Sequence, residues 1–192
     1  MTAKRKIEFF LCACLVLSTA INVHLVLGRS PKAAKSLQVS QRFPPLGGRI
    51  AARGDSYSPA INQRRVYYWF RPTCPFCQEN QGGAAQLARS LTTGEFVGIS
   101  VDNDDLRGYI DNQQVAFPVL ALSEKSPLAA KLGPTPTTFV VNASGIIEKV
   151  WAGAYVDSAR LEIERYFSVS LPSLGSSSRS RTAAPLRATR RN

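Results

Sequence analysis

The chain is poor in histidine, cysteine and methionine for its length. Its 192 residues contain one histidine, His24, together with four cysteines and one methionine. A structural zinc site needs four ligands, and the part able to fold offers only Cys74 and Cys77, so zinc is disfavoured. The missing histidine excludes a Ser-His-Asp triad or a Cys-His pair there, and Gln78 excludes haem attachment through C-x-x-C-H. We therefore expect no metal or organic cofactor.

Acidic residues are scarce at both ends of the chain, which carries a formal net charge of +11. Residues 1–35 and 171–192 hold most of the excess positive charge, whereas residues 36–170 are within one charge of neutral. A basic face for nucleic acid on the folded part therefore has little support, and no nucleic-acid partner is expected. Hydrophobic residues make up 44% of the chain, which is enough for a core and excludes wholesale disorder.

Residues 1–27 combine a basic cluster with a long apolar stretch. Lysine and arginine at positions 4–6 precede Ile7–Leu27, which is 21 residues long and mostly apolar. A helix of this length crosses a bilayer, and a basic cluster before an apolar run begins a secretion or anchoring signal. We expect a membrane anchor, with cleavage near Ser18-Thr19-Ala20 as the alternative. Either way the folded part is exported.

The rest of the chain divides into three parts. Residues 28–61 are rich in Ser, Pro, Gly, Gln and Arg, which predicts a linker and irregular or short extended structure. Residues 62–168 are the expected folded domain. Residues 169–192 show no helical or strand period and predict a disordered basic tail, with weak contact to an anionic membrane as the alternative to a solvated tail.

Strand and helix patterns alternate within the expected domain. The strand candidates are Val66–Phe70, Glu95–Val101, Thr137–Val141 and Ile146–Trp151, and the helix candidates are Pro75–Leu91, Asp104–Gln113, Pro127–Leu132 and Asp157–Phe167. A turn at residues 142–145, with Gly145 able to adopt positive φ, joins the last two strands into a hairpin. The pattern predicts an α/β fold in which helices cover both faces of a mixed sheet.

Two cysteines follow the first aromatic strand as Cys74-Pro75-Phe76-Cys77. Residues three apart lie on the same face of a helical turn, so the two sulfurs can reach one another. A thiolate at a helix N-terminus has a lowered pKa, which makes Cys74 the expected nucleophile. Cys77, one turn further along, is expected to be shielded and to resolve the mixed disulfide. An inert structural disulfide is the alternative, whereas Cys12 and Cys14 lie in the apolar stretch.

The segment Gly133-Pro-Thr-Pro-Thr-Thr-Phe139 directly precedes the third strand candidate. An X-Pro bond in a tight turn that enters a strand is a site for a cis peptide. The residue before the proline then has its backbone exposed to pair with an extended substrate.

These motifs, in this order, resemble the membrane-anchored extracytoplasmic thioredoxins of the TlpA/ResA type. The resemblance covers about residues 62–167 and depends most on the C-x-x-C motif and on the Pro-Thr-Thr-Phe segment about 60 residues later. It implies a thioredoxin fold with Cys74 as nucleophile, Cys77 as resolving thiol, Pro136 as the cis-proline and Thr135 as backbone partner of the substrate. Pro75 and Phe76 would tune the pair.

Three positions depart from the family pattern. Thr73 stands where a tryptophan commonly precedes the first cysteine. Asn80 stands where an acidic residue often follows the second cysteine, with Glu79 one place earlier. Tyr68 stands where cytoplasmic thioredoxins carry an aspartate in the strand, which leaves the proton acceptor of Cys77 unidentified.

The first functional hypothesis is a thiol–disulfide oxidoreductase that exchanges disulfides with exported proteins through a mixed disulfide. Its expected location is the bacterial inner membrane, single-pass, with the domain in the periplasm, or the periplasm itself if the N-terminus is cleaved. A membrane or periplasmic partner would recharge it. The alternatives are a thioredoxin-fold binding or assembly module with a structural disulfide, and a thiol peroxidase.

Overall fold

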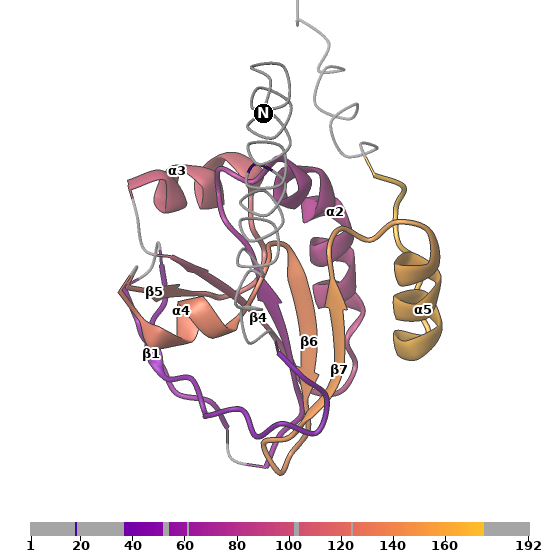
Figure 1. Ribbon diagram of the computed structural model, residues 1–192, viewed down its shortest axis with the longest axis horizontal. Coiled ribbons are helices and arrows are strands. Elements are labelled where there is room, and N and C mark those ends of the chain that lie inside the picture. The colour runs from indigo at the N-terminus through magenta and orange to yellow at the C-terminus, as the bar shows by residue number, and fades with distance from the viewer. Residues whose placement is uncertain are drawn as a thin grey trace, which may run out of the picture. The chain divides into compact units, whose positions relative to one another are not determined.

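The computed structural model describes Ser18 and residues 37–51, 54–60, 62–101, 104–123 and 125–174. The strands are β1 (Gly48–Arg49), β2 (Ser56–Tyr57), β3 (Arg65–Trp69), β4 (Glu95–Val101), β5 (Val119–Leu122), β6 (Thr137–Val141) and β7 (Ile147–Ala152). The helices are α2 (Pro75–Ser90), α3 (Asp104–Gln113), α4 (Pro127–Lys131) and α5 (Asp157–Phe167) (Figure 1).

The expected membrane anchor or signal, at residues 1–27, lies outside the described residues except for Ser18, and so does most of the basic tail. Among the helices that the structure describes, none is long and apolar enough to span a bilayer.

Five strands form the central sheet in the order β5-β4-β3-β6-β7. Strand β3 pairs in parallel with β4, and β4 pairs in parallel with β5. On the other side β3 pairs antiparallel with β6, which pairs antiparallel with β7. Figure 1 shows the strands side by side with helices beside them. The mixed sheet predicted from the alternation of elements is confirmed.

Strand β3 is buried on both faces because it lies at the centre of the sheet. Its residues alternate between two cores, as the period of a strand requires. Val66 and Tyr68 pack with residues of α2, α3 and α5, whereas Tyr67 and Trp69 pack on the opposite side with Leu132 after α4. An aromatic, β-branched segment suits this position because both of its faces need apolar side chains.

Residues 37–51 and 54–60 contribute to the second face of the sheet although they contain little regular structure. Leu37, Phe43 and Leu46 are buried in the same core as Tyr67 and Trp69. Backbone hydrogen bonds connect this segment to the β6–β7 hairpin, and an isolated bridge connects Ile50 to β5. The expected linker region therefore contributes to the fold.

Strand β4 contains a glycine at its most crowded point. A Cβ atom at Gly98 would lie 2.9 Å from the Phe117 ring, 3.1 Å from Val119 and 3.2 Å from Phe70. Any other residue would overpack this site, so Gly98 lets the aromatic side chains meet across the sheet.

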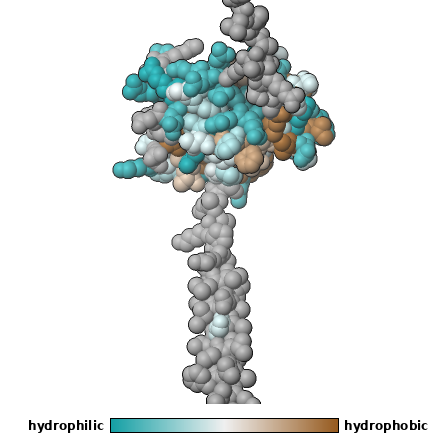
Figure 2. Space-filling model, turned by 90° about the horizontal axis from the view of Figure 1, so that it is seen from above, coloured by the Kyte–Doolittle hydropathy of each residue, from teal (hydrophilic) through white to brown (hydrophobic). Residues whose placement is uncertain are grey.

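The outer surface is mostly polar. The face in Figure 2 is largely hydrophilic, with separate hydrophobic patches. Among the described residues the large hydrophobic side chains that are exposed are Val39, Phe76, Val156 and Leu161. Phe76 lies between the two cysteines in sequence, so an apolar side chain faces solvent beside the candidate site.

Candidate active site

The two cysteines lie where the central strand ends and α2 begins. Strand β3 ends at Trp69, and Cys74 occupies the N-cap of α2 with an extended backbone, φ −83° and ψ 114°. Pro75 is the first residue of the helix, where its missing N–H costs no hydrogen bond. The first turn of α2 therefore presents backbone N–H groups toward the first cysteine.

The Cys74 side chain is partly exposed and contacts the loop before β6. Its Sγ donates a hydrogen bond to the carbonyl oxygen of Thr135 at 3.5 Å. These residues are 61 positions apart in the sequence. The pairing of β3 with β6 brings them together because Trp69 at the end of β3 lies opposite Thr137 at the start of β6.

Opposing influences act on the Cys74 thiol. Burial raises its pKa, whereas hydrogen bonds with the side chains of Cys77 and Thr135 and with the backbone of Cys77 and Phe76 lower it. The lowering influences prevail, and the pKa of Cys74 lies below its ordinary value. The positive end of the α2 dipole acts in the same direction. Cys74 therefore carries a readily ionised sulfur that solvent can reach.

Cys77 is fully buried one helical turn further along. Burial and the hydrogen bond with Cys74 raise the pKa of its thiol to about 12. Its backbone N–H donates to the Cys74 carbonyl oxygen at 3.0 Å, so the two residues share one turn. Both cysteines are free thiols in this structure. The pair is asymmetric, with a partly exposed, easily ionised sulfur beside a buried, protonated one.

The loop before β6 is fixed on both sides of Thr135. The Thr135–Pro136 peptide bond is cis, and the Pro136 side chain is buried. Thr137 Oγ1 donates to the Pro134 carbonyl at 2.6 Å, and Gly153 N donates to the Pro136 carbonyl at 2.7 Å. Because the neighbouring carbonyls already accept hydrogen bonds, the position of the Thr135 carbonyl against Cys74 is well defined.

A buried polar network lies beneath the cysteines, on the α2 side of the sheet. Asn80 Nδ2 donates to the Tyr68 hydroxyl at 3.3 Å, and Asn80 Oδ1 accepts from the Tyr155 backbone N–H at 2.8 Å. The Tyr155 hydroxyl is 2.7 Å from Thr138 Oγ1. The network joins α2, β3, β6 and the loop before α5. Asn80 both donates and accepts a hydrogen bond here, whereas an ionised carboxylate at this position could only accept.

Tyrosines take the place of acidic groups near Cys77. Burial first, and then the charges of Tyr155 and Cys77, raise the pKa of Tyr68 well above its ordinary value. Burial and the charges of Cys77 and Cys74 also raise the pKa of Tyr109, whose hydroxyl donates to Gln81 Oε1 at 3.3 Å. These phenols stay protonated at neutral pH. They therefore cannot act as bases at neutral pH.

The structure brings Cys74, Cys77 and Thr135 together, with Pro136 next to them in the chain. Phe76 and Pro75 face outward, and Phe76 is 62% exposed. Glu79 is exposed, as is Thr73.

Sequence analysis missed Tyr155, which lies 75 residues from its partner Asn80. The local signal for it is Gly83, where a Cβ would lie 2.8 Å from the Tyr155 ring. Across the described part of the chain, no cluster of three or more His, Cys, Asp or Glu side chains could hold a metal ion.

No family model and no curated protein matches the chain. Solved structures do match its fold. A thioredoxin-family thiol:disulfide interchange protein from Chlorobium tepidum is 21% identical, with a TM-score of 0.54 over 68% of this chain and 97% of that one. StoA from Bacillus subtilis is 20% identical, with a TM-score of 0.51 over 63% and 96% of the two chains.

A secreted disulfide oxidoreductase from Mycobacterium tuberculosis is 18% identical, with a TM-score of 0.54 over 65% of this chain and 95% of that one. All three similarities extend over nearly the whole of the matched proteins. The chain therefore has a thioredoxin-like α/β fold, and its structural neighbours are thioredoxin-family thiol:disulfide oxidoreductases.

Proposed function

We propose that the protein is a thiol–disulfide oxidoreductase that uses Cys74 as nucleophile and Cys77 as resolving thiol. The observation that carries this proposal is the asymmetry of the pair. Cys74 is partly exposed, and its pKa is lowered by hydrogen bonds with Cys77 and Thr135 that outweigh the effect of burial. Cys77 is fully buried and has its pKa raised, chiefly by burial. A purely structural pair has no need of this difference.

In the first step the Cys74 thiolate attacks one sulfur of a substrate disulfide. A bond forms between Cys74 Sγ and that sulfur, the substrate S–S bond breaks, and the second substrate sulfur leaves as a thiolate that takes up a proton. The lowered pKa of Cys74 supplies the thiolate at neutral pH. The exposure of Cys74 lets a macromolecular substrate reach it.

In the second step the Cys77 sulfur gives up its proton and attacks Cys74 Sγ. The Cys74–Cys77 disulfide forms, and the first substrate sulfur leaves as a thiolate. The substrate thereby gains the two electrons that the cysteine pair loses. Because Cys77 is buried with a pKa of about 12, it stays protonated and unreactive until Cys74 is in the mixed disulfide.

The substrate we propose is an extended segment of an exported protein. The Thr135 backbone, held beside Cys74 Sγ at 3.5 Å, would pair with the segment next to its disulfide. The exposed Phe76 ring offers an apolar contact on the other side of Cys74. Pro136 shapes the loop that carries Thr135, and Pro75 starts the helix that lowers the pKa of Cys74.

For the whole chain we propose a TlpA/ResA-type protein anchored in the bacterial inner membrane by residues 1–27, with residues 62–168 as the periplasmic catalytic domain. The basic cluster before Ile7–Leu27 supports export. So does the similarity to a mycobacterial oxidoreductase described as secreted. A membrane or periplasmic partner would recharge the cysteine pair, and its reduction potential sets the direction of exchange.

Trapping the mixed disulfide tests the catalytic proposal. The full chain is prepared with Cys12 and Cys14 replaced by serine, so that only the C-x-x-C thiols remain. The reduced protein should cleave a disulfide-linked fluorescent peptide, and Cys74→Ser should abolish cleavage. Cys77→Ser should instead accumulate a covalent adduct with the peptide at Cys74, seen as a mass increase that dithiothreitol reverses.

The binding-module alternative gives a different result in the same experiment. If the cysteines are only structural, the reduced protein leaves the peptide intact and Cys77→Ser forms no adduct. Either finding would remove the oxidoreductase proposal.

A further inference from the structure

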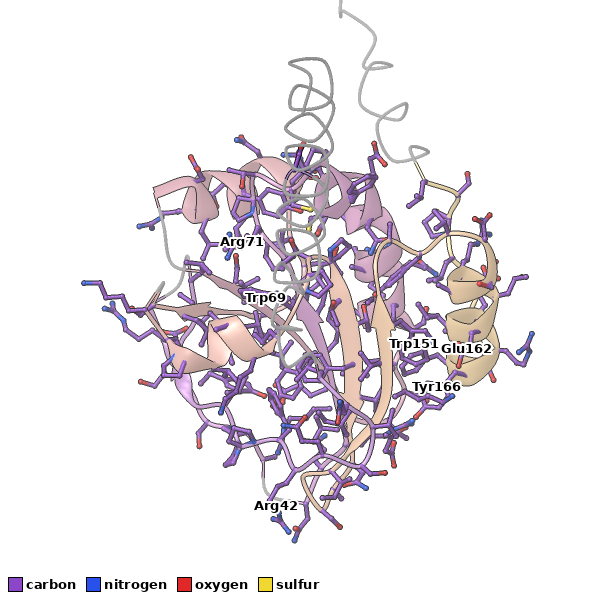
Figure 3. All side chains as sticks on the ribbon, viewed as in Figure 1. Arg42, Trp69, Arg71, Trp151, Glu162 and Tyr166 are labelled. Atoms are coloured by element: carbon purple, nitrogen blue, oxygen red, sulfur yellow. The ribbon has the colours of Figure 1, made fainter. Side chains whose placement is uncertain are left out.

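A cavity of about 280 Å³ lies at the end of the sheet away from the cysteines. Its walls come from residues 42–45, Pro59, Ala60, Asn62, the start of β3 and the turn between β6 and β7. In Figure 3, Arg42 at this cavity and Arg71, three residues before Cys74, lie at opposite ends of the domain. Strand β3 runs from the cavity toward the cysteines, and its length alone, at about 3.3 Å per residue, places the two regions about 13 Å apart.

The walls of this cavity are held in place by backbone hydrogen bonds. Phe43 N donates to the Gly145 carbonyl at 2.8 Å, and Ile147 N donates to the Gln41 carbonyl at 2.9 Å. Arg42 also forms an isolated antiparallel bridge with Ile146. Residues 41–43 and the β6–β7 hairpin are therefore held together by backbone hydrogen bonds, so the cavity between them is part of the fold.

The guanidinium group of Arg65 is buried at this cavity. Arg65 is only 7% exposed, it lines the cavity, and its Nε has no hydrogen-bond partner, although the side chain is also hydrogen-bonded to Tyr67. A charged side chain is almost never buried to this degree without an oppositely charged partner. The three ion pairs among the described residues involve Arg64, Lys149 and Arg160, so none of them neutralises Arg65.

The nearest carboxylate on the adjoining strand is already engaged. Glu95 lies beside Arg65 in the register of β3 and β4, but its carboxylate accepts a hydrogen bond of 2.5 Å from the Tyr57 hydroxyl. Among the described residues that line the cavity there is no acidic side chain, Glu95 included. The cavity therefore presents two arginines, Arg42 and Arg65, with no opposing charge on its wall.

The other walls are largely apolar. Phe43, Pro44, Pro45, Pro59 and Val141 surround the two arginines. Small-molecule sites combine such apolar walls with a few placed polar groups. A ligand that fits both features has a negatively charged head for the arginines and a compact apolar body for the proline and phenylalanine walls.

We infer that this cavity binds a carboxylate with an apolar body, the carboxylate pairing with Arg65 and the body packing against the prolines and Phe43. Carboxylate and guanidinium match in planar, two-point geometry, so such a ligand would satisfy the buried arginine. This site is separate from the cysteines and does not depend on their chemistry. Two sources supply this chemistry: a small free acid, and the carboxy terminus of a peptide.

The first test uses ¹⁹F NMR of 4-fluorobenzoate with the full chain in detergent. Its lines should broaden with the wild-type protein, whereas 4-fluorobenzamide, of the same shape without the charge, should be unaffected. Arg65→Gln should weaken benzoate binding about tenfold, the effect of losing one charge-assisted pair. Arg89→Gln removes a charge on exposed α2 surface and is the matched control, with unchanged binding expected.

A second variant keeps the test decisive if Arg65→Gln fails to fold. Ala143 is exposed in the β6–β7 turn and lines the cavity, so Ala143→Trp would fill the space without altering either arginine. This variant should lose benzoate binding. Binding that survives Ala143→Trp, or equal binding of the acid and the amide, would overturn the inference.

The two ligand sources are separated by a second probe, the peptide N-acetyl-Gly-Gly-Phe with a free carboxylate. Competition of this peptide with 4-fluorobenzoate would identify a peptide carboxy terminus as an occupant. Benzoate binding without peptide competition would identify a small free acid. If neither probe binds at millimolar concentration, the inference is wrong.

Discussion

The side-chain oxygen of Asn80 accepts a hydrogen bond of 2.8 Å from the backbone N–H of Tyr155. This contact ties the helix that carries the cysteines to the loop before α5, and both residues are buried. The amide group of Asn80 also donates to the Tyr68 hydroxyl. One side chain thereby fixes α2 against the central strand and against the C-terminal part of the domain.

Replacing Asn80 by alanine should destabilise the fold. The change leaves a buried N–H at Tyr155 and the Tyr68 hydroxyl without their partner, and a buried polar group left unpaired costs about 1–3 kcal/mol. We expect a loss of about 2–3 kcal/mol in the free energy of unfolding, measured by urea denaturation followed by tryptophan fluorescence. The neighbouring exposed change Glu79→Ala should stay within about 0.5 kcal/mol of wild type. Equal stability of Asn80→Ala and Glu79→Ala would contradict the role of the network.

Two glycines in helices should respond to alanine in opposite ways. In α2 a Cβ at Gly83 would lie 2.8 Å from the Tyr155 ring, whereas a Cβ at Gly108 in α3 would meet nothing within 4 Å. Gly83→Ala should therefore cost about 1–3 kcal/mol through overpacking. Gly108→Ala should add about 0.5–1 kcal/mol because alanine is the better helix former. Thermal unfolding should show a lower melting temperature for Gly83→Ala and a higher one for Gly108→Ala than for the wild type. A stabilised Gly83→Ala would refute the packing argument.

The regular elements of the domain could be predicted from sequence because their patterns are local. Helices α3 and α5 and strands β4 and β6 have the predicted bounds, and the ends of the other predicted elements differ by one residue. Strand β5 was missed because Val119–Leu122 is only four residues long and directly follows a proline. Its place at the edge of the sheet depends on pairing with β4, which no local pattern reveals.

The contacts that complete the site and the cavity are long-range, and for this reason sequence reasoning did not find them. The proline- and glycine-rich stretch around Phe43 indicates turns, yet its apolar side chains close one face of the sheet. Arg65 opens a strand and would be expected at the surface, but it is buried at a cavity that two distant segments, residues 42–45 and 141–145, help to line. Asn80 departs from a family pattern in sequence, and only the fold reveals its partner Tyr155.

Alkylation of the reduced protein should depend on pH differently at the two cysteines. Because hydrogen bonds with the side chains of Cys77 and Thr135 outweigh burial and lower the pKa of Cys74, its reaction with iodoacetamide should be half-maximal at a lower pH than that of an ordinary thiol. Cys77, with a pKa raised to about 12 by burial, should stay unmodified at neutral pH. Peptide mapping by mass spectrometry separates the two sites. Preferential labelling of Cys77 would contradict the assigned asymmetry.

The same two thiols should affect stability in opposite directions. The pKa of Cys74 is lower in the folded protein than in the unfolded chain, so its ionisation stabilises the fold. This stabilisation is fully present at a pH above the unfolded-state pKa. It is lost as the pH falls through the folded-state pKa. The folded pKa of Cys77 is raised, so its contribution is present below about pH 8.5 and is lost as the pH rises toward about 12. Urea titrations of Cys74→Ser and Cys77→Ser against the wild-type protein isolate each contribution.

The exposed ring of Phe76 should affect protein substrates without affecting the fold. Phe76 is 62% exposed beside Cys74, so Phe76→Ser removes little packing, and the urea midpoint should be unchanged. If the ring contacts an apolar part of the substrate, the KM for a disulfide-linked peptide should rise about tenfold. The rate with glutathione disulfide, which is too small to use this contact, should stay near wild type. A parallel loss with both substrates would instead indicate that the change acts on Cys74 itself.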